Sequence, residues 1–591
     1  MCGIIGYTGK ENAFNIVQNG LKILEYRGYD SVGMALDNGK EVKCFKAIGA
    51  SVKLFESLDA NENYANSGIG HCRWATCGKV TMENAHPQRC GKVYLVHNGI
   101  IENYKQLIEE FHFTNLTSQT DTEVIAHLID YFYDGDPVKA IYHATKYLEG
   151  SYAIVVMFSD HHDCLYACRK VSPLVFAKNE KGIAIASELL PLNNGEYKYS
   201  YDLVEKDILA VIGDEFTIYD SNLEKTTYSP IEIKKEDIAS KNGFSTFLEK
   251  EIYQQPEVLQ QCLDCFNNEH FFPTITKQQI EKIKRIYLIA CGTSHYASLV
   301  IKNNIQKYLH IDCASFISSE FQESEPIIDK DTLVIAISQS GETIDTILAV
   351  QYAKEKGAKI LSLVNVENSL LVKISDYHIV SPAKREMSVA STKAYSSQVM
   401  ILNLFILYLT QDKLLIEDEL EKLKKIPSAV QTILNEADKL NKVVQQEKDK
   451  TVILLGRGLD YLTLLEGALK VKELAYMNIN AYPAGELKHG PLAIVDENTL
   501  VLGLCTQKEL YPKMLNNLNE VKARKANVIF FVSKQLANNS GYQEIILPEM
   551  PEEYSNIVSV VVFQLLALKL AQSKGYNVDK PRNLAKVVTV E

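Results

Sequence analysis

Short apolar runs of β type recur through residues 1–220, with two helical patterns among them. The β-type runs cover residues 3–7, 93–97, 152–157 and 184–186, and the helical spacing of apolar residues covers 13–24 and 123–133. These periodicities predict one mixed α/β domain. Residues 221–250 are polar and charged with little periodicity, which predicts a linker.

The remainder of the chain repeats one pattern twice. Apolar β-type runs alternate with amphipathic helices, as in parallel α/β domains. Three runs recur in the same order about 166 residues later: those starting at Arg285, Asp331 and Ala358 correspond to those starting at Thr451, Asn498 and Ala526. Such self-similarity indicates a duplicated unit. We therefore predict two related α/β domains, at residues 251–435 and 436–591.

Composition and charge narrow the function classes. At 591 residues the chain is too long for one hydrophobic core, and 46% apolar residues is ordinary for a soluble protein. A formal net charge of −12 gives no electrostatic attraction for nucleic acid or an anionic membrane, so we expect neither as a partner. Residues 557–571 are the most apolar stretch, but Gln564 and Lys569 interrupt it, which favours a buried helix over a membrane span.

The cysteines indicate a reducing compartment. Twelve cysteines are scattered along the chain, and the N-terminal residues lack the basic and apolar regions of a signal peptide. Cys262 and Cys265 have C-x-x-C spacing without a second pair at zinc-site distance. We expect a cytoplasmic protein with reduced thiols, without a metal and without another cofactor.

A cysteine at position two offers a nucleophile. If Met1 is removed, Cys2 carries a thiol beside a free α-amino group, which titrates at about 8. A nucleophile and a base on one residue can attack an amide, although a cysteine at this position is more often inert.

Polar segments downstream could bind an amino-acid substrate. Arg73 could hold an α-carboxylate through two hydrogen bonds, Asp121 could hold an α-ammonium group, and Asn98 with the Gly99 backbone N–H could form an oxyanion hole. Taken singly, Arg73 could instead form a surface ion pair, and Asp121 could cap a helix.

Together these segments resemble the glutaminase domain of the class II (N-terminal nucleophile) glutamine amidotransferases. The matching stretches are residues 2–6, 26–31, 70–76, 84–87, 97–99 and 120–123. The resemblance implies that Cys2 is the nucleophile and that Asn98 and Gly99 stabilise the oxyanion. It implies that four residues bind glutamine: Arg73, Thr76, His86 and Asp121. The family usually has histidine where this chain has Cys77, and a thiol cannot replace imidazole as a paired donor and acceptor.

A serine-rich turn in the first repeat could bind phosphate. Residues 338–343 read Ser-Gln-Ser-Gly-Glu-Thr and lie between an apolar run and a helical pattern. A strand, a turn and a helix N-terminus direct several hydroxyl and N–H groups to one point, which suits a phosphate. The alternative is a well-capped helix with a polar turn. Thr293 and Ser294 follow an apolar run in the same way.

The second repeat supplies candidate acid–base groups. Glu466, Lys470 and Glu473 share one face of a predicted helix. They are either solvated charges on the surface or an acid–base array. In the second case, Glu473 would move a proton between C1 and C2 of a sugar. His489 lies in a glycine-containing loop, and histidine is a common acid–base group. Lys586, near the C-terminus, is either a solvated tail residue or a Schiff-base lysine.

Over its full length the chain resembles the isomerizing glutamine–fructose-6-phosphate aminotransferases, or glucosamine-6-phosphate synthases. The resemblance implies two tandem doubly wound SIS (sugar isomerase) domains after the glutaminase domain. It implies conversion of glutamine and fructose 6-phosphate into glutamate and glucosamine 6-phosphate, the first step of hexosamine and UDP-N-acetylglucosamine biosynthesis. Near Pro581 the chain departs mildly from the family, since the usual Asp-Gln-Pro reads Asp579-Lys580-Pro581.

The same resemblance implies the roles of individual residues. Phosphate is held by Ser338, Gln339, Ser340 and Thr343, assisted by Thr293 and Ser294. Glu473 is the isomerisation base with Lys470 beside it, and Lys586 carries an imine. His489 opens the sugar ring and is lent by the partner subunit of a homodimer, and Trp74 gates an ammonia channel. Two alternatives stay open: another class II amidotransferase or sugar-phosphate deaminase, and a non-catalytic sugar-phosphate sensor.

Overall fold

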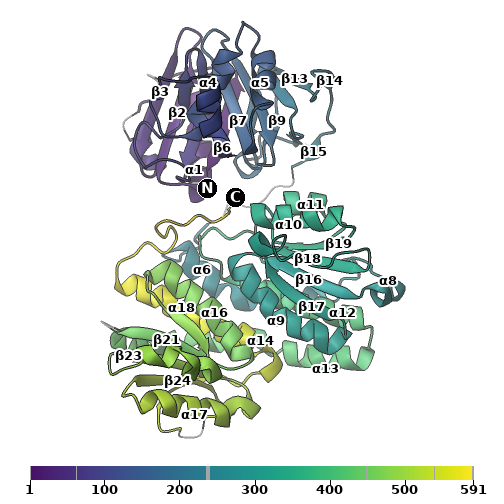
Figure 1. Cartoon of the computed structure of the whole chain (residues 1–591), viewed down its shortest axis with the longest axis vertical. Coiled ribbons are helices and arrows are strands. Elements are labelled where there is room, and N and C mark those ends of the chain that lie inside the picture. Colours follow the sequence, from purple (N-terminus) through teal and green to yellow (C-terminus); the bar gives the residue numbers. More distant parts are fainter. Residues whose placement is uncertain are drawn as a thin grey trace. The chain divides into compact units, whose positions relative to one another are not determined.

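The computed structural model describes residues 2–56, 58–60, 63–233, 240–447, 450–537 and 540–588 (Figure 1). The chain divides into two compact units. Residues 1–239 and 585–591 make up unit 1, and residues 240–584 make up unit 2.

Unit 1 is built on two antiparallel sheets. In sheet order, the first holds β15 (Ile231–Glu232), β11 (Tyr199–Asp202), β9 (Val175–Lys178), β10 (Gly182–Ala186), β1 (Gly3–Gly9), β4 (Ser67–Arg73), β2 (Ser31–Asp37) and β3 (Val42–Ile48). The second holds β14 (Lys225–Thr226), β13 (Glu215–Tyr219), β12 (Ile208–Ile212), β8 (Cys164–Lys170), β7 (Gly150–Phe158), β6 (Val93–Ile101) and β5 (Gln88–Cys90).

Alternating side chains of the strands explain the layers of unit 1. Along β1, Ile5 and Tyr7 pack against α1 (Ala13–Leu24) and α2 (Ser51–Phe55), whereas Ile4 points into a core shared with the second sheet. The outer face of the second sheet is covered by α3 (Tyr104–Glu110), α4 (Asp121–Tyr131) and α5 (Pro137–Thr145). The result is a two-sheet sandwich between two helical layers, which confirms the mixed α/β prediction.

The predicted linker, residues 221–250, contains part of this sandwich. Strands β14 and β15 lie within it and each pairs with a sheet of unit 1, and helix α6 (Phe247–Tyr253) begins before it ends. Two-residue strands carry no readable alternation, so periodicity could not find them.

Unit 2 contains two parallel sheets of five strands with one topology. The first holds, in sheet order, β17 (Asp312–Ile317), β16 (Arg285–Ala290), β18 (Thr332–Ser338), β19 (Lys359–Val364) and β20 (Tyr377–Val380). The second holds β22 (Asn480–Pro483), β21 (Thr451–Gly456), β23 (Thr499–Cys505), β24 (Asn527–Ser533) and β25 (Gln543–Leu547). The three predicted sequence echoes are the pairs β16 and β21, β18 and β23, and β19 and β24, so the duplication is confirmed.

Both sheets have the order second–first–third–fourth–fifth along the chain. In such doubly wound sheets, ligands bind beyond the carboxyl ends of the first and third strands, where the winding direction reverses. The helices around the sheets are α7 (Gln255–Cys265), α8 (Lys277–Lys282), α9 (Gly292–Leu309), α10 (Ile344–Glu355), α11 (Leu370–Ile374), α12 (Lys393–Thr410), α13 (Lys413–Leu423), α14 (Ile426–Asn435), α15 (Asn441–Gln446), α16 (Leu459–Ala475), α17 (Tyr511–Lys522) and α18 (Ser555–Ser573).

Helix α18 lies in the core of unit 2. It is long and apolar enough to cross a membrane, but 94% of its most apolar window is buried inside the protein. A Cβ at Gly467 of α16 would lie 2.8 Å from Phe563, so glycine permits the close approach of the two helices. Gln564 is also buried, where it accepts a hydrogen bond from Gln255 (2.8 Å) and donates one to the carbonyl of Thr392 (3.3 Å). The predicted buried helix over residues 557–571 is therefore confirmed.

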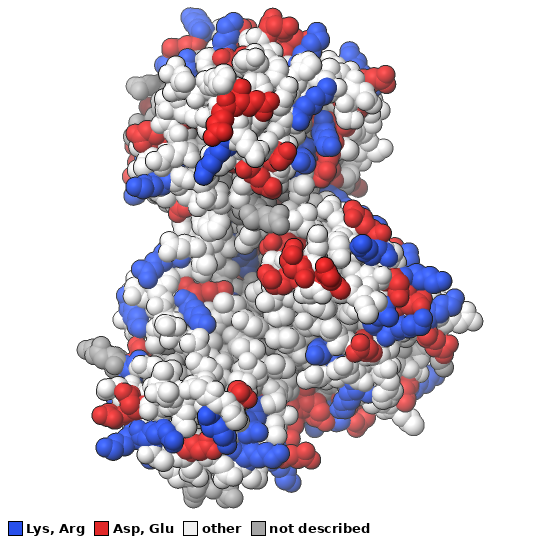
Figure 2. Space-filling view, viewed as in Figure 1, with Lys and Arg blue, Asp and Glu red and all other residues white. Residues whose placement is uncertain are grey.

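Charged side chains of both signs are interspersed over the face of each unit seen in Figure 2. The net charge of the whole chain is −12, so a ligand anion must be held by local donors.

Candidate active sites

The candidate nucleophile of unit 1 lies where two strands meet. Strand β1 pairs with β4 so that Gly3 is opposite Cys72, which brings Cys2 beside the residues that follow β4. The Cys2 Sγ lies 3.5 Å from the carbonyl oxygen of Trp74. Burial raises the pKa of the Cys2 thiol above its ordinary value, so attack on an amide requires a base.

Asn98 and Gly99, the candidate oxyanion residues, lie on β6 next to Cys2. Asn98 is buried, and its Nδ2 donates to the carbonyl oxygen of Cys2 at 3.2 Å. Gly99 has φ 140°, and a Cβ there would lie 2.0 Å from the carbonyl oxygen of Ser151. Only glycine fits this position, so the backbone geometry beside the nucleophile depends on it.

Arg73 is buried and organises the loop that follows β4. Its guanidinium donates to the carbonyl oxygens of Lys79 (3.2 Å) and Cys77. From the other side, Asp30 accepts a hydrogen bond from the Ala75 N–H at 2.9 Å. Burial excludes the surface ion pair considered for Arg73. Sequence reasoning assigned no role to Asp30, although it belongs to the matching stretch 26–31.

Asp121 is not the cap of α4. The cap is Thr120, whose side chain accepts from the Glu123 N–H. The buried carboxylate of Asp121 accepts from the N–H groups of Ile101 (2.9 Å) and Thr122 (3.0 Å), which ties the start of α4 to the end of β6.

A pair of stacked imidazoles lies in the same unit. The ring of His86 stacks on that of His71 with centroids 4.0 Å apart, and Nε2 of His71 lies 2.9 Å from the carbonyl oxygen of His97. Burial lowers the pKa of His71 to about 3 and the pKa of His86 well below its ordinary value, so both rings are neutral. Sequence reasoning missed His71, although it belongs to a quoted segment.

The other candidates of unit 1 lie on the loop after β4. Trp74 and Cys77 are half-buried, and Thr76 is exposed. The Cys77 Sγ lies 3.4 Å from the carbonyl oxygen of Gln119, so this thiol faces the segment that precedes α4.

In unit 2 the serine-rich turn lies at the carboxyl end of β18. Ser338 is buried, and its Oγ accepts from the Gly341 N–H (3.0 Å) and lies 3.1 Å from the Oγ1 of Thr343. Gln339 is also buried, whereas Ser340 and Thr343 are half-buried. Thr343 precedes α10 without a side-chain cap, so the first N–H groups of this helix face the turn.

Thr293 and Ser294 lie at the same edge of the sheet. Strands β16 and β18 are parallel neighbours, with Ala290 opposite Ile337, so the turns after them adjoin. The Ser294 Oγ accepts from Nε2 of Gln398 at 3.0 Å. These predicted phosphate residues therefore gather at the switch point of the first sheet.

The three candidate acid–base residues of α16 form a buried cluster. Glu466 and Lys470 are fully buried, and Glu473 is 19% exposed. The Lys470 Nζ lies 2.6 Å from Glu473, 3.4 Å from Glu466 and 3.0 Å from the Thr293 hydroxyl, which in turn donates to Glu466 at 3.2 Å. A solvated helix face is therefore excluded, and Thr293 joins the two repeats through this cluster.

The charges of this cluster follow from burial and mutual attraction. Burial raises the pKa of Glu466 to about 8, although Lys470 opposes the shift. Burial alone would lower the pKa of Lys470, but Glu466 and Glu473 outweigh it and raise that pKa to about 12. At neutral pH Lys470 is therefore charged, and Glu466 holds a proton in much of the population.

A pocket of about 420 Å³ opens beside Glu473. It is lined by Leu469, Lys472, Glu473, Tyr476, Met477, Asn478, Arg582, Asn583 and Leu584. Lys586 comes two residues after Leu584, in the stretch that groups with unit 1. His489 is exposed at the end of a 3₁₀ helix (Ala484–His489), and among the described residues no hydrogen bond or ion pair joins it to Glu473.

The corresponding edge of the second sheet is occupied by the chain itself. Gln507, after β23, accepts from the Leu459 N–H at the start of α16 (2.9 Å). The buried carboxylate of Asp460 accepts from the N–H (2.9 Å) and the hydroxyl (2.5 Å) of Thr506. Sequence reasoning missed this arrangement, since neither Asp460 nor Gln507 lies in a recognisable motif.

The described ranges contain no group of three or more His, Cys, Asp or Glu side chains placed to hold a metal ion.

Family models match both units. The model described as "glutamine amidotransferase domain" matches residues 73–194, and the model "SIS domain" matches residues 279–408 and 447–573.

Curated relatives align over the full length of the chain. Proteins named glutamine–fructose-6-phosphate aminotransferase [isomerizing] from Clostridium tetani and Aquifex aeolicus are 40% and 39% identical, and 100% of each chain is covered.

Solved structures resemble unit 2. The C-terminal domain of glucosamine-fructose-6-phosphate aminotransferase from Francisella tularensis is 35% identical with a TM-score of 0.55, covering 58% of this chain and 100% of that one. A protein described as a phosphosugar isomerase from Clostridium difficile is 20% identical with a TM-score of 0.51, covering 57% and 96%, and shares the fold.

Proposed function

Because the chain belongs to the family of the isomerizing glutamine–fructose-6-phosphate aminotransferases, we infer that it transfers the amide nitrogen of glutamine to fructose 6-phosphate and isomerises the product to glucosamine 6-phosphate. The observation that carries this conclusion is the presence, in one chain, of a half-buried cysteine beside Asn98 and a buried Glu–Lys–Glu cluster at a sugar-isomerase switch point.

In unit 1 we assign glutamine hydrolysis to Cys2. Its thiol proton passes to a base, for which the α-amino group of a Cys2 freed of Met1 is suited at about pH 8. The sulfur then attacks the amide carbon, the C–N bond breaks, and the same proton leaves with ammonia. The side-chain amide of Asn98 and the Gly99 N–H stabilise the oxyanion, and water releases glutamate from the thioester.

We assign substrate binding in this unit to Arg73, Thr76, His86 and Asp121. Buried and hydrogen-bonded to loop carbonyls, Arg73 keeps the loop in one conformation and offers a positive charge to the α-carboxylate of glutamine. The carboxylate of Asp121, held by two N–H groups, suits the α-ammonium group. Neutral His86 can accept or donate a hydrogen bond without adding charge.

In unit 2 we assign phosphate binding to the turns after β16 and β18. Ser338, Gln339, Ser340 and Thr343 offer hydroxyl and N–H groups near the start of α10, with Thr293 and Ser294 beside them. These donors can hold the anion without much positive charge, which suits an acidic chain.

Isomerisation belongs to Glu473 in this scheme. The Lys586 amine condenses with the C2 carbonyl of the open-chain ketose and releases water, and ammonia then displaces the lysine amine to leave an imine at C2. Glu473 then takes a proton from C1 and returns one to C2, which leaves an aldose. Charged Lys470, at 2.6 Å, orients this carboxylate.

We further propose a cytoplasmic homodimer. The exposed His489 would open the sugar ring in the partner subunit, and Trp74 would gate an internal path for ammonia, which must not be protonated in bulk water.

The test is to measure glutamate and glucosamine 6-phosphate in one reaction, with and without fructose 6-phosphate. We expect equal amounts of both products when both substrates are present. Cys2→Ala should abolish both products, whereas Cys44→Ala, at an exposed cysteine, should change neither. Glutamate release without any amino sugar would overturn the assignment of unit 2.

A further inference from the structure

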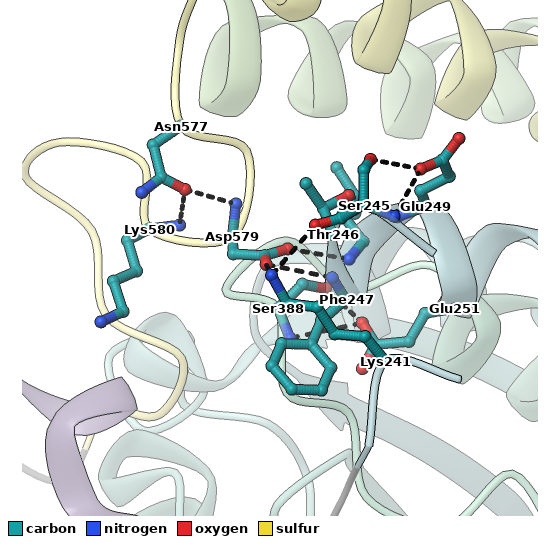
Figure 3. A network of polar contacts seen from close by, with 11 residues as sticks. Lys241, Ser245, Thr246, Phe247, Glu249, Glu251, Ser388, Asn577, Asp579 and Lys580 are labelled. Atoms are coloured by element: carbon teal, nitrogen blue, oxygen red, sulfur yellow. Dashed lines mark hydrogen bonds and ion pairs between the residues drawn. The ribbon is translucent and has the colours of Figure 1, made fainter. Parts of the chain in front are cut away.

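The C-terminal tail of unit 2 is fastened to α6 by one carboxylate. Asp579, which follows α18, accepts hydrogen bonds from the backbone N–H groups of Phe247 (3.0 Å) and Leu248 (2.9 Å), as Figure 3 shows. Lys241 lies 3.7 Å from the same carboxylate. Two segments more than 300 positions apart are thus joined at the start of a helix, where N–H groups favour an anion.

Both sides of this junction are themselves held in place. On the tail, Asn577 accepts from the N–H groups of Asp579 (3.1 Å) and Lys580 (3.2 Å), which fixes a turn around the carboxylate. On α6, buried Glu251 accepts from the Met387 N–H (2.5 Å) and the Ser388 N–H (3.3 Å). Figure 3 shows Glu251 beside Ser388. The carboxylate therefore links two ordered segments.

The tail beyond Asp579 leads directly to the pocket beside Glu473. The Arg582 N–H donates to the hydroxyl of Tyr476 at 2.8 Å, and its guanidinium lies over the ring of that tyrosine at 4.2 Å. Arg582, Asn583 and Leu584 are pocket-lining residues, as are Glu473 and Tyr476. The position of this wall thus depends on where the chain leaves Asp579.

We propose that Asp579 is a positioning residue for the sugar reaction. By accepting the first N–H groups of α6, its carboxylate holds the tail so that residues 582–584 form one wall of the pocket. This inference rests on the proposed function, because it assigns the pocket to sugar.

The contact between Asp579 and α6 depends on the charge of the carboxylate. A carboxylate accepts two N–H groups through two oxygens, and hydrogen bonds to an ionised acceptor are about twice as strong as neutral ones. In Asp579→Asn one oxygen becomes an NH₂ group, so one helix N–H loses its acceptor while the shape is kept.

The test compares Asp579→Asn with Thr246→Ala. Thr246 caps the same helix through the Glu249 N–H at 3.2 Å, but it does not hold the tail. For Asp579→Asn we expect kcat/KM for fructose 6-phosphate to fall about 10- to 100-fold, because this is the effect of losing one hydrogen bond to a charged group. In the absence of fructose 6-phosphate, glutamate release should stay unchanged. When fructose 6-phosphate is present, the ratio of glutamate to glucosamine 6-phosphate should rise above one. Asp579→Glu, which keeps the charge, should restore part of the loss.

Three results would overturn the proposal. The first is an unchanged kcat/KM for fructose 6-phosphate in Asp579→Asn. The second is an equal loss of kcat/KM in Thr246→Ala, which would mean that only the stability of α6 matters. The third is an Asp579→Glu variant whose kcat/KM is no higher than that of Asp579→Asn. If Asp579→Asn fails to fold, Asp579→Glu provides the test. A ratio of glutamate to glucosamine 6-phosphate equal to one in that variant would also overturn the proposal. A wild-type enzyme that makes no glucosamine 6-phosphate would contradict the proposed function instead.

Discussion

The two repeats of unit 2 share a topology and differ at the edge where such sheets bind ligands. After β16 and β18 the first repeat has hydroxyl groups and the uncapped start of α10. After β21 and β23 the second repeat has Gln507 and the Asp460 carboxylate, which pair with the Leu459 N–H and with Thr506. In the second repeat, side chains of the chain itself therefore occupy the edge that is open in the first repeat.

This difference separates binding from chemistry. With its own edge filled, the second repeat contributes α16, whose Glu466, Lys470 and Glu473 reach the Thr293 hydroxyl of the first repeat. A duplicated fold thus gives one repeat that we assign to holding phosphate and one that we assign to moving protons.

The sharpest test of this separation is Glu473→Gln. Loss of the general base should lower glucosamine 6-phosphate formation by about 10²- to 10⁴-fold, while glutamate release by unit 1 continues. Coupled product assays would detect this, with exposed Glu497→Gln as the control in the same repeat. If Glu473→Gln retains amino-sugar formation, the general base must lie in the first repeat instead.

A smaller effect is expected at the open edge of the first repeat. Thr343→Ala removes a hydroxyl donor beside the start of α10 and should raise KM for fructose 6-phosphate about tenfold with little change in kcat. The comparison variant is Thr410→Ala, whose hydroxyl donates to the carbonyl of Leu407 away from this edge. A fall in kcat at constant KM would contradict a purely binding role.

The smallest effect concerns stability at the closed edge. Burial raises the pKa of Asp460 to about 7, above its unfolded value of about 3.9. Between these values the folded state keeps a proton that the unfolded state releases, so stability falls as pH rises from about 4 to about 7. Asp460→Asn mimics the protonated form, so its melting temperature should match wild type near pH 3 and exceed it by a few degrees near pH 8.

Exposed Asp312→Asn is the matched control, since it makes the same substitution at the surface. Thermal unfolding followed at several pH values would measure both variants. If Asp460→Asn is less stable than wild type at pH 8, the carboxylate is needed in its charged form and the closed edge behaves as a filled anion site.

The sequence predicted the elements and motifs that depend on neighbouring residues. It did not predict contacts between residues that are distant along the chain. Helical spacing predicted that Glu466, Lys470 and Glu473 share a face, because that follows from the helix period alone. It did not predict the contact with Thr293, which depends on how two repeats pack. The serine-rich turn was predicted because strand, turn and helix signals are adjacent there.

The unpredicted features share a physical reason. Asp460 and Asp579 act on backbone N–H groups of residues distant along the chain, and a single carboxylate has no sequence signature for this role. Burial of Arg73 and Glu466 likewise depends on the folded core, so a surface pair could not be excluded before the structure was known.

The place of α18 has a consequence for synthesis on the ribosome. This helix is translated after the strands of both sheets, yet its Gln564 bonds to Gln255 and to the Thr392 carbonyl of the first repeat. Unit 1, apart from its final residues, is complete more than 300 codons earlier and can fold first. The apolar surfaces of both repeats must wait for α18 to leave the exit tunnel, so nascent unit 2 is the part of this protein most in need of a chaperone.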